Sequence, residues 1–172
     1  MTSPKPDKPE ETGRERSAAR LAAVQALYEM DMVGAKANSV LEEFLLNRWR
    51  KADSSETSLR DSDGNPENAA EPLVEPDKEW LSELVHGVTK RHLELDSLIE
   101  PALKGDLTLE RLESLIRVIL RAGAYELSTK RNIPAAVVIN EYLDVAHAFF
   151  EGNEPNLVNG VLDKVAHEIR KD

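Results

Sequence analysis

The sequence contains no cysteine, and it is poor in aromatic residues and in long hydrophobic runs. Without cysteine there are no disulfides, cysteine-ligated zinc sites or cysteine nucleophiles. Aromatic residues make up only 5% of the 172 positions, which disfavours a β-sandwich, whose strands draw on aromatic and β-branched side chains. The longest apolar run, from Ala135 to Ile139, is far shorter than the ~20 residues of a membrane span. The amino-terminal stretch is too polar for a secretory signal, so we expect a cytoplasmic protein with no membrane segment.

The remaining composition is that of one soluble domain. Hydrophobic residues form 41% of the chain, which is enough to bury a core. The formal net charge is −10, from 22 basic and 32 acidic side chains. A uniformly acidic surface would repel nucleic acid, so the placement of the basic residues matters more than their total.

Two polar segments interrupt the apolar pattern. Residues 1–13 hold three prolines and no apolar periodicity, which predicts a disordered tail. The segment at about 51–76 carries two basic and seven acidic side chains, a net charge of −5, and is predicted to be a disordered acidic insertion. The sequence therefore predicts one helical domain over 14–172, with this insertion inside it.

Apolar residues elsewhere recur at helical spacing and predict an all-α protein of about seven helices without a convincing strand. The first helix is predicted from Arg14 to Met32, and Pro76 with Asp77 marks the start of the third. The longest apolar stripe predicts a central, largely buried helix and comprises Leu112, Leu115, Ile116, Ile119, Leu120, Gly123 and Leu127.

Signatures of catalysis and of metal or cofactor binding are absent. The sequence has no GxxxxGK(S/T) or GxGxxG phosphate-binding loop, no GxSxG nucleophile elbow and no HExxH motif. One Glu-x-x-His pair occurs at Glu83 and His86, but a di-iron bundle needs two such motifs. We interpret this pair as two helix-surface residues and expect no enzyme activity, no cofactor and no metal.

A small basic cluster lies at the start of the first predicted helix. Arg14, Arg16 and Arg20 fall within seven positions, opposed only by Glu15. Arg16 and Arg20 are four residues apart, so they are expected to share one helix face. Guanidinium groups present a planar fork of donors to phosphate, which makes this cluster a candidate RNA contact. Secondary basic candidates, whose alternative interpretation is the solvated side of amphipathic helices, are Lys104, Arg117, Arg121, Lys130 and Arg131.

Four blocks of the sequence carry a resemblance to a known family. The blocks are AVQALY at 23–28, ILRAGAYEL at 119–127, IP at 133–134 with VINE at 138–141, and LVNGVLDK at 157–164. In these blocks the chain resembles the NusB family of bacterial transcription antitermination factors. They occur in the family's order and extend over most of 14–172.

The resemblance implies an all-α fold of two packed helical subdomains and a role in binding rather than catalysis. The implied ligand is the boxA element of nascent ribosomal-RNA transcripts, bound together with the small-subunit ribosomal protein that acts as NusE. That pair joins the RNA polymerase antitermination complex and helps the polymerase resist termination. The implied RNA contacts are Arg14, Arg16 and Arg20 on the first helix, and Asn153, Asn156 and Leu157 at the turn before the last helix.

Two alternatives are weighed beside this interpretation. A ribosomal-RNA methyltransferase with a NusB-like domain is rejected, because the sequence has no glycine-rich loop and no room for a second domain. A helical protein–protein adaptor that does not bind RNA is kept as an alternative, since the cluster contains few arginines and the chain is acidic. An acidic body suits a basic ribosomal protein as partner. Self-association is also left open.

Overall fold

The computed structural model describes residues 9–43 and 74–170, and within these ranges the only regular secondary structure is helical. The described ranges contain seven α-helices, together with two 3₁₀ turns at Glu100–Ala102 and Leu109–Arg111. The α-helices are α1 (Pro9–Val33), α2 (Ala37–Glu43), α4 (Lys78–Lys90), α5 (His92–Ile99), α6 (Ser114–Thr129), α7 (Ala135–Phe149) and α8 (Glu154–Ile169). The predicted all-α class is confirmed.

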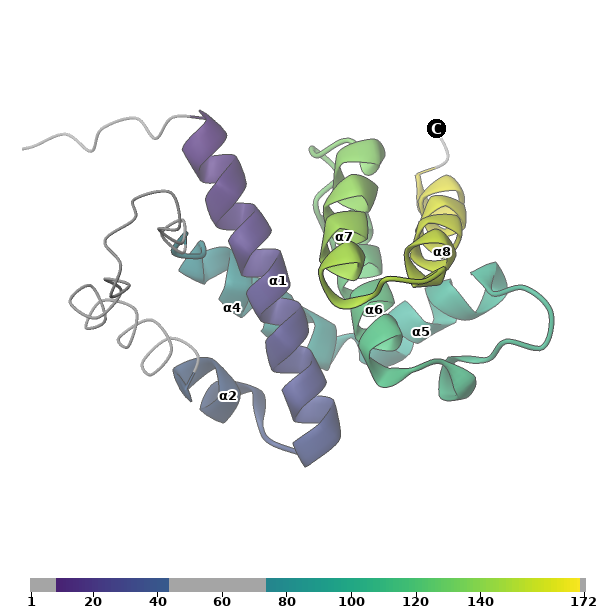
Figure 1. The fold of residues 1–172 in the computed structure, drawn as a ribbon, viewed down its shortest axis with the longest axis horizontal. Helices are drawn as coiled ribbons and strands as arrows, with labels where there is room; N and C mark the ends of the chain where they lie inside the picture. Colours follow the sequence, from purple (N-terminus) through teal and green to yellow (C-terminus); the bar gives the residue numbers. More distant parts are fainter. Residues whose placement is uncertain (1–8, 44–73, 171–172) are drawn as a thin grey trace, which may run out of the picture.

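The helices form two packed groups (Figure 1). One group contains α1, α2 and α4, and the other contains α5, α6, α7 and α8. The two groups meet chiefly where α1 and α4 pack against α6. None of the described helices has the length and apolar character needed to cross a membrane.

Helix α6 is the central packing element, as its apolar stripe predicts. Ile119, Leu120 and Leu127 are completely buried in it. Gly123 allows α8 to approach closely, because a Cβ at this position would lie only 2.8 Å from the Cδ atoms of Leu162. The apolar faces of α7 and α8 close over this helix and complete the core.

The boundaries of two predicted segments differ from the structure. Helix α1 begins at Pro9 and not at Arg14, so residues 9–13 belong to the helix instead of the predicted tail. Proline suits a first helical turn, since it lacks only an N–H that has no helical partner there. Residues 1–8 lie outside the described residues.

The carboxyl end of the predicted acidic insertion connects directly to α4. Val74 and Glu75 are exposed, whereas Pro76 is buried against the domain. Asp77 then caps α4, because its Oδ1 accepts a hydrogen bond of 3.0 Å from the backbone N–H of Trp80. The rest of the predicted insertion, 51–73, lies outside the described residues.

Candidate nucleic-acid interface

Arg20, the third arginine of the predicted cluster, is buried in the folded protein. Its side chain is 4% exposed, and it reaches from α1 to the fully buried Glu126 on α6. Nε donates to Oε2 and Nη2 donates to Oε1, each over 2.9 Å. Arg16 and Arg20 both lie near the Trp80 ring, as expected for one helix face, but α1 packs Arg20 against α6 and buries it.

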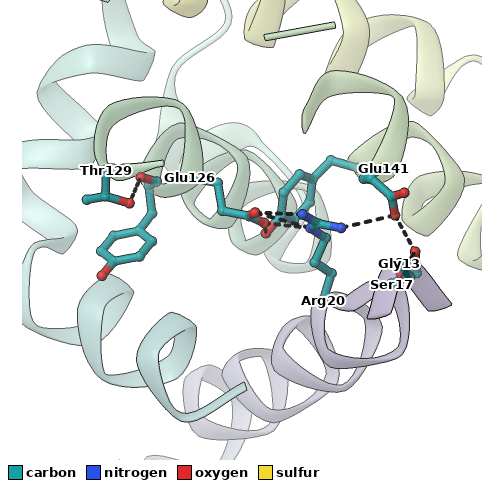
Figure 2. A network of polar contacts seen from close by, with 8 residues as sticks. Gly13, Ser17, Arg20, Glu126, Thr129 and Glu141 are labelled. Carbon is teal, nitrogen blue, oxygen red and sulfur yellow. Dashed lines mark hydrogen bonds and ion pairs between the residues drawn. The ribbon is translucent and has the colours of Figure 1, made fainter. Parts of the chain in front are cut away.

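Arg20 belongs to a polar network that joins α1, α6 and α7 (Figure 2). The buried hydroxyl of Tyr142 donates to the Glu126 carboxylate. Glu141 lies 3.3 Å from Nη1 of Arg20 and accepts a hydrogen bond of 2.7 Å from the Ser17 hydroxyl. The polar groups of this network are directed at one another, so the network fixes the position of α1 on the rest of the domain.

Burial and charge set the protonation of this network. Burial alone would lower the pKa of Arg20, but the hydrogen bonds and negative charge of Glu126 outweigh it and raise that pKa. Burial, reinforced by the charge of Glu126, raises the pKa of Tyr142 well above its ordinary value. The network therefore holds a charged guanidinium and a neutral phenol at neutral pH.

Arg14 and Arg16, the other two arginines of the predicted cluster, reach different surroundings. Arg14 is exposed and lines an open groove of about 700 Å³ between α1 and α7, where Glu141 and Asp144 supply negative charge. Arg16 is partly buried, and its guanidinium carbon lies 4.4 Å from the centroid of the Trp80 ring on α4. The structure thus places Arg14 apart from Arg16 and Arg20, and of the latter two only Arg20 is fully buried.

Trp80 also attracts Lys130, which the sequence offered only as a secondary candidate. The Lys130 ammonium at the carboxyl end of α6 lies 4.6 Å from the centroid of the Trp80 ring, and it forms an ion pair of 2.7 Å with Glu83. Arg16, Trp80 and Lys130, from α1, α4 and α6, are called the basic–aromatic cluster below. Trp80 is not among the candidate RNA contacts predicted from the sequence, and the scarcity of aromatic residues in the chain is a signal that could have singled it out.

More positive charge gathers beside this cluster, at the carboxyl end of α6. Arg131 is exposed, and its Nη2 donates to the carbonyl of Ile169 over 3.1 Å. Arg170, which sequence reasoning missed, donates to the carbonyls of Leu127 and Lys130 over 3.0 and 3.1 Å. Burial and the neighbouring Arg131 charge lower the pKa of Arg170. These cations also compensate the negative end of the α6 dipole.

The residues predicted near the last turn form a separate group. Asn153 stands at the start of α8, where its carbonyl accepts hydrogen bonds from the backbone N–H groups of Asn156 and Leu157. Asn156 and Leu157 line a small cavity of about 170 Å³ with Lys104 and Lys164. The structure therefore brings Lys104 to this group, while Arg14 lines a different cavity.

Arg117 and Arg121 are tied to carboxylates. Arg121 forms a two-point ion pair with Asp96, at 2.7 and 2.9 Å. Arg117 donates to the Ser114 hydroxyl over 3.0 Å and lies 3.4 Å from an oxygen of Asp31. Their positive charge is therefore locally compensated. Within the described ranges, no three His, Asp or Glu side chains are placed to hold a metal ion.

Comparisons with known proteins agree with this architecture. The NusB family model matches residues 17–167. The transcription antitermination protein NusB of Rhizobium johnstonii is 39% identical over 170 residues, covering 99% of this chain and 97% of that protein. A NusB structure from T. maritima has a TM-score of 0.68 at 26% identity, covering 91% of this chain and 93% of that one.

A second solved structure has the same fold. It is described as the antitermination factors NusB and NusE in complex with dsRNA, and it matches with a TM-score of 0.67 at 22% identity. The match covers 90% of this chain and 98% of that chain. From the match to the family over most of its length and from the identity to its curated relative, the chain belongs to the NusB family.

Proposed function

We propose that this chain is a transcription antitermination factor that binds the boxA element of nascent ribosomal-RNA transcripts together with the ribosomal protein acting as NusE. It joins the RNA polymerase antitermination complex in the cytoplasm and acts by binding, without catalysis. Its relatives carry the name of an antitermination protein, and a protein of the same fold is described in complex with NusE and dsRNA.

The observation that carries RNA binding is the convergence of Arg16 and Lys130 on Trp80. Three helices place two cations on one aromatic ring, although the chain as a whole has a net charge of −10. Arg131 adds an exposed positive charge beside Lys130. Single-stranded RNA is bound by such combinations of backbone-directed cations and stacking surfaces. Arg14, on the exposed side of α1, supplies a further phosphate contact in this proposal.

A second set of contacts in the proposal is the group at the start of α8. Asn156 offers hydrogen-bonding groups to a base edge, while Lys104 at the same cavity offers positive charge to a phosphate. Asn153 and Leu157 complete this group. Because Arg20 is buried and Arg117 and Arg121 are paired with carboxylates, we leave these three arginines out of the proposed RNA surface.

The protein–protein adaptor remains the second candidate, and one observation favours it. The groove between α1 and α7 presents Glu141 and Asp144, so this surface suits a basic protein better than a phosphate backbone. In the antitermination proposal the same acidic body helps to recruit the basic ribosomal protein. The two candidates differ only in whether RNA is contacted directly.

Titration of a labelled boxA oligoribonucleotide tests the proposal. Fluorescence anisotropy is measured with this chain alone, with the ribosomal protein alone and with both, at several salt concentrations. We expect the two proteins together to bind more tightly than either one, with an affinity that falls as salt rises. A pair that assembles but binds RNA no better than the ribosomal protein alone would establish the adaptor instead. Sedimentation of the chain alone reports any self-association.

A further inference from the structure

We propose that Trp80 is a stacking residue for one RNA base, and that the cations now over its ring transfer to RNA phosphates when that base binds. The inference rests on the proposed function and adds to it a single-nucleotide subsite made by Trp80, Arg16 and Lys130. In the free protein the two cations occupy the place of the base. In the complex the indole holds the base, and the guanidinium and ammonium hold the phosphates on either side of it.

The geometry of the basic–aromatic cluster supports this exchange. The guanidinium carbon of Arg16 and the ammonium nitrogen of Lys130 lie 4.4 and 4.6 Å from the ring centroid, within the range of cation–π attraction. Trp80 as a whole is only partly buried. Because Arg16 and Lys130 come from different helices, they can contact phosphates on opposite sides of one nucleotide.

Unsatisfied donors in the cluster are a second, independent observation. The Nε–H of Arg16 and the Nε1–H of Trp80 are both buried, and in the described part of the chain neither has a hydrogen-bond acceptor. Buried donors in proteins almost always have a partner. Phosphate and base oxygens are acceptors that a bound nucleotide would bring. The free state of the cluster is therefore one that RNA can improve.

Arg20 shows that not every cation near the ring is free to move. Its guanidinium carbon lies 5.5 Å from the Trp80 centroid, but its N–H groups are committed to Glu126 and Glu141. Lys130 has only Glu83 as an ionic partner within the described residues, and that carboxylate is on the surface. In this proposal Arg20 keeps its position near the ring, while Arg16 and Lys130 exchange partners.

The balance of gained and lost interactions gives the exchange its direction. A base stacked on the ring replaces one of the two cation–π interactions, and the phosphate contacts of the displaced cations offset the loss of the other. The displaced cations are not left unpaired, because each forms a charge-assisted hydrogen bond with phosphate. Stacking is tolerant of base identity, so this subsite contributes affinity more than sequence preference.

The first experiment measures Trp80 directly in an otherwise native site. The sequence has two tryptophans, so Trp49→Phe leaves Trp80 as the sole indole emitter. This protein is titrated with single-stranded boxA RNA, and tryptophan emission is compared with the anisotropy of the labelled RNA. We expect emission to change and to saturate together with the anisotropy. Bound RNA with unchanged emission would refute the subsite but leave the proposed function standing, whereas no RNA binding even after addition of the ribosomal protein would refute both.

The second experiment removes the ring, with the ribosomal protein present throughout. Trp80→Leu should weaken boxA binding about tenfold, equivalent to about 1.4 kcal/mol, while Trp80→Phe should retain most of the affinity. Leu93→Ala, at an exposed apolar residue of α5, is the matched control and should bind like the wild type. Thermal unfolding identifies a variant that fails to fold, in which case Trp80→Phe and the emission titration decide. Equal affinities of a folded Trp80→Leu variant and the wild type would overturn the proposal.

A scan with abasic nucleotides locates the stacked base. Each position of the boxA oligonucleotide is replaced in turn, and affinities are measured for the wild type and for Trp80→Leu. At one position the loss of the base should weaken RNA binding by the wild type about tenfold. It should leave the affinity of Trp80→Leu almost unchanged, because the interacting ring is already gone. If the losses are additive at every position, then no base stacks on Trp80.

The salt dependence of RNA binding tests whether Lys130 moves onto a phosphate. Lys130→Ala should reduce the slope of log affinity against log salt by about 0.7, the value for one phosphate contact with a single strand. Lys90→Ala, at an exposed lysine on the far end of α4, is the control and should leave the slope unchanged. An unchanged slope in Lys130→Ala would show that this lysine does not move onto the RNA.

Discussion

Arg20 and Glu126 form a buried two-point ion pair, with Nε to Oε2 and Nη2 to Oε1 both at 2.9 Å, although 106 positions separate them in the sequence. The pair fastens α1 to α6, and Tyr142 donates a further hydrogen bond to the same carboxylate. Taking two charges out of water is costly, so the pair matters more for the position of α1 than for net stability. That position determines where Arg14 and Arg16 stand.

Removal of one partner should be severe. Arg20→Leu leaves the Glu126 carboxylate buried without its cation, and we expect a loss of about 3–5 kcal/mol in the free energy of unfolding, measured by urea denaturation. Arg91→Leu, which breaks the exposed ion pair with Glu94, is the control and should leave the unfolding midpoint nearly unchanged.

A compensated variant tests whether the unpaired Glu126 carboxylate causes that loss of stability. Arg20→Leu combined with Glu126→Leu and Tyr142→Phe removes the whole buried polar group, so it should be more stable than Arg20→Leu alone. If the triple variant is instead the less stable of the two, the cost of an unpaired buried carboxylate does not explain the result.

Stability should fall in alkaline solution because of Tyr142. Its pKa in the folded protein is raised well above the ordinary value, while in the unfolded chain it is about 10. Above about pH 10 the unfolded chain therefore holds fewer protons than the folded one, and stability decreases as pH rises, by up to about 1.4 kcal/mol per pH unit. Below that pH the group contributes no slope.

Urea denaturation at about pH 9, 10 and 11 measures this fall. Tyr142→Phe removes the group and should flatten the decrease, even though it lowers stability at neutral pH by leaving Glu126 with one donor fewer. Tyr125→Phe is the comparison, because burial and the nearby Glu83 also raise the pKa of Tyr125, which is less buried. A slope that is the same in Tyr142→Phe and in the wild type would contradict the assignment.

Most of the fold could be predicted from local sequence pattern. The stripe from Leu112 to Leu127 identified α6 as the central helix because a largely buried helix has apolar residues around most of its surface. Pro76 and Asp77 marked the start of α4 because proline and an N-cap carboxylate act within a few residues. Such signals need no knowledge of distant segments.

The candidate site was less accessible, because it depends on partners that are distant in sequence. Arg16 and Arg20 look equivalent on a helix, and only Glu126 on α6 determines that one of them is buried. Likewise, nothing near Trp80 in the sequence indicates that Arg16 and Lys130 meet on its ring. Helical periodicity reports which face is apolar, but it does not report which polar side chains from other helices converge.

Substitution of two glycines by alanine should change the stability of the protein in opposite directions. At Gly87 a Cβ would lie 2.3 Å from ring atoms of Tyr125, so Gly87→Ala should cost about 1–3 kcal/mol through displacement of that ring. At Gly160, on α8, a Cβ meets no atom within 4 Å, so Gly160→Ala should stabilise by up to about 1 kcal/mol through helix propensity. Thermal unfolding measures both. Stabilisation by Gly87→Ala would show that α4 and α6 are less closely packed at this point.

The arginines of α1 should divide into a structural residue and RNA-binding residues. Arg14→Ala with Arg16→Ala removes the two that are not buried in ion pairs. This variant should weaken boxA binding in the presence of the ribosomal protein, and the salt slope should fall by about 0.7 for each phosphate that is no longer bound. Its free energy of unfolding should change by about 1 kcal/mol or less, because within the described residues neither arginine forms an ion pair and the variant gives up the cation–π interaction of Arg16 with Trp80.

The matched variant Arg20→Ala removes the same type of side chain from the same helix. The free energy of unfolding should fall several times further than in the double variant, because Glu126 is left in the core without its cation. In conditions where Arg20→Ala remains folded, the slope of its log affinity against log salt should equal that of the wild type. A guanidinium that is paired with two carboxylates does not bind a phosphate. A reduced slope in folded Arg20→Ala would show that this arginine leaves Glu126 to bind RNA. An unchanged slope in the double variant would instead place the RNA-binding residues away from α1.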